Sequence, residues 1–413
     1  MKKIILKKNT GDAVQKRIGY KINYFNELNP AQYVAVMHNN GAALVIAGAG
    51  TGKTRTLIYR VSRLIEDGVP PESVLLLTFT RKASAEMLRR AANMLDGRCE
   101  RISGGTFHSF ALQELRKYAK AIGYEPGFNI LDQGDCEDTI NLLRSQMKLD
   151  KSKRRFPRKE TLNTIFNLSV NKMMPVEDVV LKDYPSFAED MDEIESLFYQ
   201  FNIYKRKYNL MDYDDLLLNL LKLLQEKKEI KAEMNGKYKY VMVDEYQDTN
   251  RLQHEIVLNL GGASENIMAV GDDAQSIYSF RGANFQNIMT FPDSFRECEI
   301  YKIEENYRSV QPILDMTNII IDAAAYKYEK ELFTNKPGGE MPKIITAENE
   351  RQQSEFVVQE ILQLREEGFD LEDIAVLARS GFLMFDLEIE LNRANIPYRS
   401  EEHTSELQSR QVI

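Results

Sequence analysis

A short glycine-rich segment has the residue types and spacing of a loop that binds phosphate groups. It lies between an apolar run at 44–48 and a helical stretch at 55–67, so strand, loop and helix follow in the required order. Glycines let several backbone N–H groups face a phosphate, and the start of the helix adds a positive end. We expect the Lys53 ammonium to neutralise the β- and γ-phosphates of a nucleotide and the Thr54 hydroxyl to bind Mg²⁺. The expected phosphate-binding residues are Ala47, Gly48, Ala49, Gly50, Thr51, Gly52, Lys53, Thr54 and Arg55.

This loop departs from the common pattern at one position. Ala47 stands where a first glycine is usual, but Gly48 and Gly50 follow closely and make the change tolerable. A glycine-rich turn without a ligand is the alternative interpretation. The adjacent Lys53 and Thr54 argue against it.

A second apolar run, at 240–243, ends in two carboxylates that suit the metal of a phosphate site. Asp244 would hold Mg²⁺, directly or through water, and Glu245 would polarise the attacking water as a general base. An Asp-Glu pair after a strand is also a common helix cap. Together with the lysine loop, the catalytic interpretation is the stronger one.

The composition is that of an ordinary soluble protein with more than one compact unit. The 413 residues are 43% hydrophobic and 28% charged. They contain no run of about 18 apolar residues, the length needed to cross a membrane. Residues 1–20 lack the apolar core of a signal peptide. Cys99, Cys136 and Cys298 have no metal-binding spacing and suit a reducing cytoplasm. A net charge of −8 argues weakly against indiscriminate binding to a polyanion but is compatible with a local cationic groove.

Apolar runs alternate with helical periodicity, which predicts a parallel sheet buried between two layers of helices. The expected strands are 44–48, 74–80, 240–244, 267–271 and 374–378. Between about 110 and 210 strand signals are scarce, and residues of 191–201 form one apolar stripe at helical spacing. We interpret this segment as a helical domain inserted into the first α/β domain. A second α/β unit is expected to begin near Cys298.

Six further segments resemble motifs of the superfamily 1 helicases related to UvrD, Rep and PcrA. With the phosphate loop they make seven motifs in the family's order, and the resemblance covers nearly all of 28–398. The six segments are 28–32 (LNPAQ), 78–83 (TFTRKA), 105–110 (GTFHSF), 212–217 (DYDDLL), 270–283 (VGDDAQSIYSFRGA) and 305–309 (ENYRS).

The resemblance implies a motor that uses ATP and Mg²⁺. Gln32 would read the adenine edge, and Tyr307 would stack on the adenine ring. Gln275 has both a donor and an acceptor, so it could contact the γ-phosphate or the attacking water. Arg308 would be the arginine finger that reaches the transferring phosphoryl group from the second motor domain. A surface arginine in a structural salt bridge is the alternative.

The resemblance also implies single-stranded DNA as the track and DNA junctions as partners. Aromatic faces accept any base at about 1–3 kcal/mol per stack, which gives a grip without sequence preference. Core packing is the alternative for each aromatic residue and is the favoured one for Phe110. RNA as the track is a further alternative. Phe280 stands where many family members have tryptophan. The expected DNA contacts are Phe79, Thr80, Thr106, His108, Tyr278, Phe280 and Arg281.

The fold implied is α/β, a RecA-like P-loop sheet domain with a helical insertion and then a partial second RecA-like domain. The expected boundaries are 1–23 for an N-terminal extension, 24–110 and 211–297 for the first motor domain, 111–210 for the insertion and 298–398 for the partial second domain. Residues 399–413 are interpreted as a non-native tail, because a common sequencing adapter read in one frame gives this peptide. Six cations among the nine residues 151–159 are either a solvated loop or a contact to DNA phosphates.

The leading interpretation is a cytoplasmic ATP-dependent DNA helicase or translocase, with 3′ to 5′ polarity by resemblance, acting in repair or replication. The motor part of a helicase–nuclease is a second interpretation, and a nucleic-acid-binding protein with a vestigial ATP site is a third. The residue types at Lys53, Asp244 and Arg308 argue against the third. Family members continue beyond residue 398, so this chain is expected to bind nucleotide, to hydrolyse it poorly and not to unwind DNA.

Overall fold

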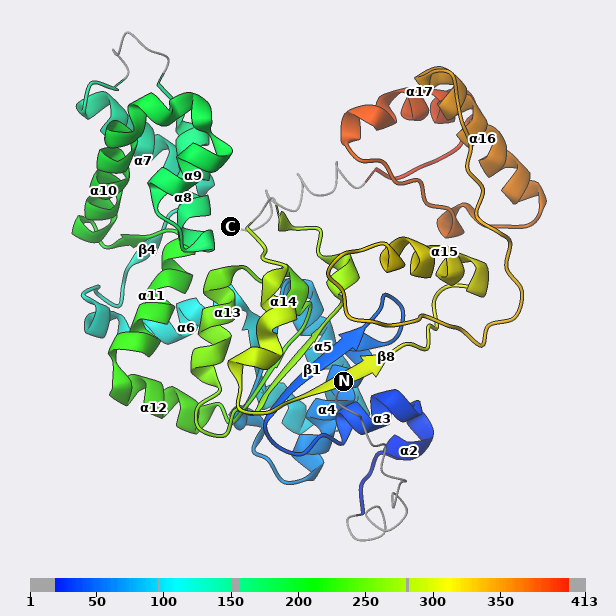
Figure 1. The fold of residues 1–413 in the computed structure, drawn as a ribbon, viewed down its shortest axis with the longest axis horizontal. Helices are drawn as coiled ribbons and strands as arrows, with labels where there is room; N and C mark the ends of the chain where they lie inside the picture. Colours follow the sequence, from blue (N-terminus) through cyan, green and yellow to red (C-terminus); the bar gives the residue numbers. More distant parts are fainter. Residues whose placement is uncertain (1–18, 96, 150–155, 280–281, 401–413) are drawn as a thin grey trace. The chain divides into compact units, whose positions relative to one another are not determined.

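The computed structural model describes residues 19–95, 97–149, 156–279 and 282–400 (Figure 1). The chain divides into two compact units, Met1–Glu340 and Met341–Ile413. The first unit contains the sheet and most of the helices, whereas the described part of the second consists of helices and loops. Within the residues described, no helix is both long and apolar enough to cross a bilayer.

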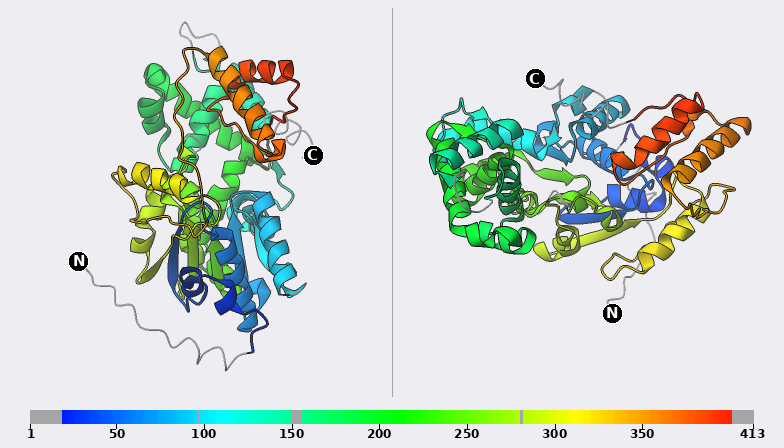
Figure 2. Two further views of the ribbon diagram at one scale, coloured as in Figure 1. Left: turned by 90° about the vertical axis from the view of Figure 1, so that its right-hand side faces the viewer. Right: turned by 90° about the horizontal axis from the view of Figure 1, so that it is seen from above.

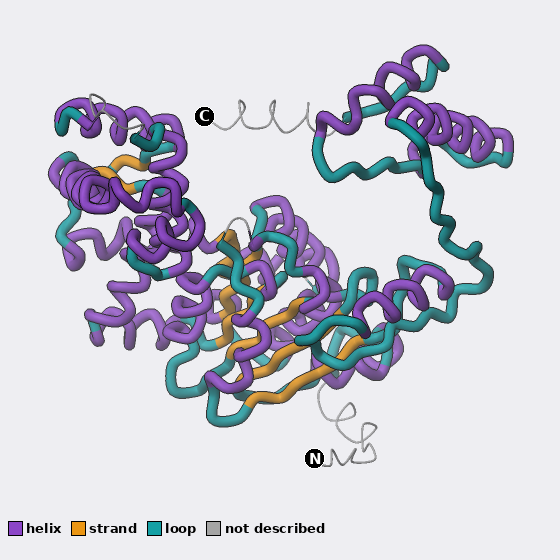
Figure 3. Tube along the Cα trace, turned by 45° about the horizontal axis from the view of Figure 1, so that its top comes forward, coloured by secondary structure: helices purple, strands orange, loops and turns teal. Residues whose placement is uncertain are grey.

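A six-stranded parallel sheet organises the first unit (Figure 3). Its order is β3-β2-β6-β7-β1-β8, and every neighbouring pair is parallel. Parallel neighbours need long crossover connections, which the helices of this unit supply. The strands are β1 (Ala42–Ala47), β2 (Val74–Thr78), β3 (Ser103–Thr106), β6 (Tyr240–Val243), β7 (Ile267–Gly271) and β8 (Cys298–Ile303).

The central strands are apolar on both sides because both faces of the sheet are covered. In β1, Leu44 and Ile46 belong to one core cluster, whereas Ala43 and Val45 belong to the other. Successive side chains of a strand point to opposite faces, so a sheet buried on both faces requires uninterrupted apolar runs. The runs at 44–48, 74–80, 240–244 and 267–271 each overlap such a strand.

Helices lie on both sides of this sheet, as two further views show (Figure 2). One face is covered by α6 (Phe107–Tyr118), α11 (Tyr213–Glu226) and α13 (Arg251–Leu260), and the other by α3 (Pro30–Val36), α4 (Lys53–Glu66) and α5 (Arg81–Met94). The remaining helices are α2 (Tyr24–Glu27), α7 (Gln133–Gln146), α8 (Lys159–Lys172), α9 (Val176–Asp183), α10 (Met191–Lys207), α12 (Lys228–Lys237), α14 (Gln286–Thr290), α15 (Gln311–Asp322), α16 (Glu350–Glu366) and α17 (Phe385–Arg393).

The inserted helices α7 to α10 have a hydrophobic core of their own. Ile194, Leu197 and Phe201 of α10 are buried in it, in agreement with the apolar stripe in the sequence. A short parallel pair, β4 (Asn129–Ile130) with β5 (Leu210–Met211), joins the two ends of the insertion. The boundary expected at residue 111 falls inside α6, whose buried residues belong to the core of the sheet. The separate core of the insertion begins at Leu131.

Two expectations from the sequence differ from the structure. Residues 374–378 form no strand, and Leu377 is 93% exposed. A strand needs a partner for its backbone groups, and no strand occurs within the described residues 341–400. Cys298 does not open a second sheet, because β8 pairs in parallel with β1 and forms the edge of the first sheet.

A buried lysine holds the point where the chain returns from the insertion to the sheet domain. Lys205 of α10 is 3% exposed, and its Nζ lies 2.6 Å from Asp212 Oδ2 and 2.7 Å from Asp215 Oδ2. The two aspartates also form the capping box that starts α11. One cation therefore neutralises two carboxylates that the helix start brings together.

We predict that Lys205→Met lowers the free energy of unfolding by about 3–5 kcal/mol, because it leaves buried carboxylates without a counter-charge. Urea denaturation followed by circular dichroism measures this change. Lys207→Met on the exposed side of the same helix is the matched control and should change stability by less than about 0.5 kcal/mol. Equal effects of the two substitutions would contradict the role assigned to Lys205.

Candidate functional site

The sequence motifs meet at one edge of the sheet because they follow the carboxyl ends of parallel strands. The glycine loop follows β1, Phe79 lies one residue after β2, and Asp244 comes directly after β6. Asp272 comes directly after β7. In open parallel sheets, ligands bind at this edge.

The glycine loop has a conformation that side chains would disturb. Gly50 and Gly52 have φ angles of +78° and +90°, in the region that favours glycine. A Cβ atom on Gly50 would lie 2.6 Å from Arg308 Cβ. The Thr51 hydroxyl donates to the Gly48 carbonyl over 2.8 Å and closes the turn. The loop leads directly into α4, so Lys53 and Thr54 occupy its first turn.

Lys53 and Glu245 contact each other across this edge. The Lys53 Nζ lies 2.7 Å from Glu245 Oε2, and the lysine side chain is 9% exposed. Glu245 has a φ angle of +49°, which is uncommon for a residue with a side chain and marks a backbone held by its surroundings. The geometry brings together a lysine and a carboxylate that the sequence separates by 192 residues.

Asp244 is a buried carboxylate suited to a metal ion. Burial and the neighbouring Glu245 together raise the pKa of Asp244 to about 7, and Lys53 opposes the shift. Its Oδ1 is buried and has no hydrogen-bond partner among the described residues. Carboxylate and hydroxyl oxygens are hard ligands of the kind that Mg²⁺ prefers, so Asp244 and Thr54 fit this ion.

Asp244 and Thr54 by themselves would leave most positions around a Mg²⁺ ion to waters and phosphate oxygens. Nowhere among the described residues do three His, Cys, Asp or Glu side chains form a group able to hold a metal. Mg²⁺ is usually bound by one or two carboxylates together with waters and substrate phosphates.

The residues expected near the adenine are linked to the glycine loop. Gln32 donates through Nε2 to the Thr51 carbonyl over 2.9 Å, and its Oε1 completes the capping box of α3 with Asn29. Asn29 Nδ2 donates to the Tyr307 hydroxyl over 2.9 Å, and the Tyr307 side chain is 49% exposed. The Arg55 guanidinium carbon lies 4.8 Å from the centroid of the Tyr59 ring. Gln32 is 1% exposed, and its amide is held at both ends, by the Thr51 carbonyl and by the Asn29 N–H.

Arg308 lies beside the loop because Asn306, two residues earlier, anchors its backbone. The Asn306 side chain donates to the Ala49 carbonyl over 2.5 Å, and its oxygen accepts from the backbone N–H of Arg308 over 2.8 Å. The Tyr307 N–H donates to the Gly50 carbonyl over 2.9 Å. Arg308, expected as the arginine finger, thus lies next to the phosphate loop.

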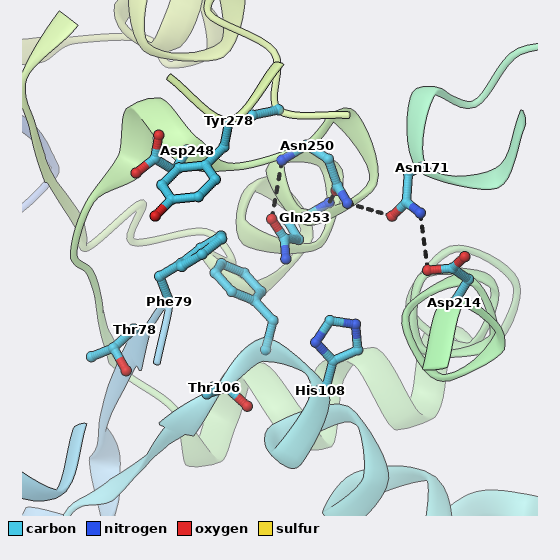
Figure 4. Close-up of a pocket in the computed structure, with 12 residues that line it drawn as sticks. Thr78, Phe79, Thr106, His108, Asn171, Asp214, Asp248, Asn250, Gln253 and Tyr278 are labelled. Atoms are coloured by element: carbon cyan, nitrogen blue, oxygen red, sulfur yellow. Dashed lines mark hydrogen bonds between the residues drawn. The ribbon is translucent and has the colours of Figure 1, made fainter. Parts of the chain in front are cut away.

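A second feature of the same edge is a cavity of about 320 Å³ beside two aromatic rings (Figure 4). The centroids of Phe79 and Tyr278 are 5.2 Å apart and the rings are tilted by 35°. His108 lies at the cavity, and burial lowers its pKa, which favours the neutral ring. The lining residues are Thr78, Phe79, Thr106, Phe107, His108, Asn171, Asp214, Asp248, Asn250, Gln253, Tyr278 and Ala283.

The expected DNA contacts divide into three groups. Phe79, Thr106, His108 and Tyr278 line this one cavity. Thr80 does not line it, and its hydroxyl instead caps α5 by accepting from the Ala83 N–H. Phe280 and Arg281 lie outside the described residues. The cations at 151–155 and residues 401–413 of the tail, which are not among these seven contacts, also lie outside them. Phe110 is buried in the core of the sheet, as favoured from the sequence.

The polar wall of the cavity was not expected from the sequence. Asn250 Nδ2 donates to Asn171 Oδ1 over 2.5 Å, and Asn171 Nδ2 donates to Asp214 Oδ1 over 2.9 Å (Figure 4). Burial raises the pKa of Asp214 to about 7. Asn171 comes from the inserted helix α8, and no local pattern marks it, because only the tertiary fold brings it to the sheet edge.

Together, the RecA-like sheet, the glycine loop and the paired lysine and carboxylates define a P-loop nucleotide-binding protein. Comparison with protein families narrows this class. The UvrD/REP helicase N-terminal domain matches residues 28–296, and the UvrD-like helicase C-terminal domain matches residues 301–413. The chain belongs to the UvrD/REP helicase family.

Individual relatives agree with this assignment. The chain is 33% identical over 374 residues to the ATP-dependent DNA helicase PcrA of Staphylococcus aureus, which covers 90% of this chain and 50% of the relative. It is 33% identical over 372 residues to the protein of the same name from Staphylococcus epidermidis, with the same coverage of both chains. The chain therefore spans about half the length of these relatives.

The buried position of Asp244 predicts a pH-dependent affinity for Mg²⁺-nucleotide. Because its pKa is raised to about 7, the carboxyl is mostly protonated at pH 6 and mostly charged at pH 8. A proton competes with the metal, so Mg²⁺ should strengthen nucleotide binding about tenfold more at pH 8 than at pH 6.

Titration of a fluorescent nucleotide with and without Mg²⁺ at both pH values measures this difference. Asp244→Asn is the control, since its amide does not titrate, and the contribution of Mg²⁺ should be weaker and flat with pH. The same Mg²⁺ contribution at pH 6 and pH 8 in the unsubstituted chain would contradict the assignment.

Proposed function

We propose that the chain is the ATP-binding part of a DNA helicase that moves along single-stranded DNA. The observation that carries the proposal is the location of two sites on one sheet edge, the Lys53–Glu245 contact and the cavity that Phe79 and Tyr278 help to line. A motor needs a nucleotide site and a track site whose states depend on each other. The relatives are named ATP-dependent DNA helicases, which supports the same function.

In the proposed nucleotide site, residues of the phosphate loop and of the segment after β6 would have different roles. Lys53 would bind the β- and γ-phosphates, and Glu245 would orient and deprotonate the attacking water. Thr54 and Asp244 would hold Mg²⁺, which would neutralise charge on the phosphate oxygens when bound. Arg308 would stabilise charge that develops on the transferred phosphoryl group, and Gln275 would contact the γ-phosphate or the attacking water.

In the proposed track site, bases would stack on the rings of Phe79 and Tyr278. The cavity volume lies near the lower end of the range for small-ligand sites, about 300–1,000 Å³, which suits one base or part of one. Stacking does not depend on overall charge, so it is compatible with the net charge of −8. Movement from 3′ to 5′, a role in repair or replication, action at DNA junctions and a cytoplasmic location belong to the same proposal. We also propose weak unwinding by this 413-residue chain, because the described residues 341–400 form no strand that could organise a rigid second lobe.

The test of this function is ATP hydrolysis with and without single-stranded DNA. We expect DNA to stimulate hydrolysis, and Glu245→Gln to lower kcat by about 10²–10⁴-fold with nucleotide binding retained, because a general base is lost. Lys53→Ala should weaken nucleotide binding itself. DNA binding without any effect of Lys53→Ala on nucleotide binding or hydrolysis would point instead to a binding protein with a vestigial ATP site.

The track site makes a separate prediction. Tyr278→Ala should weaken binding of an oligothymidylate by about 1–3 kcal/mol, or roughly 5- to 150-fold, because one stacking face is lost. Fluorescence anisotropy with a labelled oligonucleotide measures this change. Tyr199→Ala, at a 65% exposed tyrosine on α10, is the matched control and should leave the affinity unchanged. If Tyr278→Ala and Tyr199→Ala bound the oligothymidylate with equal affinity, the proposal that the cavity binds DNA would be wrong.

A further inference from the structure

Asp272, at the end of β7, is a junction between several segments. Its carboxylate Oδ1 accepts from Lys330 Nζ over 2.5 Å and from the Ala274 N–H over 3.1 Å, and its Oδ2 accepts from the Gln275 side chain. The Asp272 residue is 3% exposed. These bonds fix the start of the loop that carries Gln275 and, three residues later, Tyr278.

Gln247 connects this junction to the proposed nucleotide site. Its Nε2 donates to Glu245 Oε2 over 2.8 Å, the same oxygen that contacts Lys53, and its Oε1 accepts from the Asp272 N–H over 2.9 Å. Gln247 is 1% exposed; its bond to the Asp272 N–H is buried, and its bond to Glu245 is partly buried. A Cβ atom on Gly271 would lie 2.6 Å from Gln247 Oε1, so the glycine leaves room for this amide. A continuous polar path therefore runs from Lys53 to Asp272.

Lys330 reaches this path from a distant part of the chain. Its side chain is 4% exposed and forms salt bridges with both Asp272 and Asp273, whose side chains are equally buried. The backbone N–H of Tyr328 donates to Asp273 Oδ2 over 3.0 Å. One buried cation thus compensates two adjacent carboxylates, an arrangement whose loss leaves like charges facing each other.

The segment that carries Lys330 also packs on the phosphate loop. The Leu332 N–H donates to Asn318 Oδ1 of α15 over 3.0 Å, and Asn318 Nδ2 donates to the Leu332 carbonyl over 2.9 Å. A Cβ atom on Gly48 would lie 2.6 Å from Leu332 Cδ2. Residues 328–332 therefore contact both the loop after β7 and the loop after β1.

We propose that Lys330 is a positioning residue that links the nucleotide site to the track site. It holds Asp272 where Gln247 joins the loop of Tyr278 to Glu245. A nucleotide that binds Lys53 or Glu245 changes the partners of Glu245 Oε2, the oxygen to which Gln247 donates. Gln247 also accepts from the Asp272 N–H, so a shift of its amide moves Asp272 and the loop that carries Tyr278. This inference rests on the proposed function, since it assigns a coupling between its two sites.

The experiment measures the affinity for single-stranded DNA with and without Mg²⁺ and a non-hydrolysable ATP analogue. The ratio of the two dissociation constants is the coupling factor, which is typically 5- to 150-fold for linked sites. In Lys330→Met we expect this factor to fall below about twofold, while the affinity for each ligand alone stays within about threefold. Lys330→Arg, which keeps the charge, should restore a measurable part of the factor. Lys327→Met, which removes a nearby salt bridge with Asp322, is the matched control and should keep it.

A second variant guards against misfolding of Lys330→Met. Gln247→Leu cuts the same path at another residue without leaving a charge unpaired, and it should lower the coupling factor equally. An unchanged factor in either folded variant would overturn the proposal, as would a factor near one in the unsubstituted chain that binds both ligands. If the unsubstituted chain bound neither nucleotide nor DNA, the proposed function itself would fail, and this outcome is distinct from a loss of coupling alone.

Discussion

The proposed site depends on a lysine and a carboxylate that meet over an intervening strand. Lys53 follows β1 and Glu245 follows β6, and β7 lies between these two strands in the sheet. Neighbouring strands are about 4.8 Å apart, so the two strand ends are separated by roughly 10 Å. A long lysine side chain can span this gap only if the end of β7 is small. Gly271, the last residue of β7, meets this requirement and leaves its place to the Gln247 amide.

The same edge concentrates negative charge around few cations. Asp244, Glu245, Asp272 and Asp273 all lie there, and Lys53 and Lys330 form salt bridges with three of them. The remaining one, Asp244, has a raised pKa because burial disfavours its charge. In the proposed nucleotide site, a divalent cation would replace the proton on Asp244, whose Oδ1 has no hydrogen-bond partner among the described residues. The charges of this edge are therefore compatible with the metal–nucleotide complex proposed above.

The inserted helices contribute to the site although they form a separate core. Asn171 of α8 bonds to Asn250 of the sheet domain and to Asp214 at the start of α11. This polar wall faces the cavity from the side opposite the aromatic rings (Figure 4). The insertion is therefore part of the proposed track site and not only an addition to the domain surface.

How far the sequence alone reaches depends on the range of the interactions involved. The glycine loop, the carboxylates after 240–243 and the strand at 267–271 follow from local patterns, because glycine conformation, side-chain chemistry and burial on both faces leave a mark on adjacent residues. The aromatic residues of the cavity were identified by resemblance, and spacing alone would not have distinguished them from core. A local pattern indicates that a segment is apolar but does not identify its pairing partner. For this reason residues 374–378 resemble a strand in the sequence but form none, and the pairing of β8 with β1 could not be predicted.

The sequence by itself determined the class of protein, since a phosphate loop and a set of ordered motifs need no knowledge of the fold. The tertiary structure alone decided which side chains share a site. Asn171 and Lys330 have no sequence signal, because a hydrogen bond or salt bridge between distant segments depends only on where the folded chain places them. Parallel strands joined by long crossovers make most such contacts non-local.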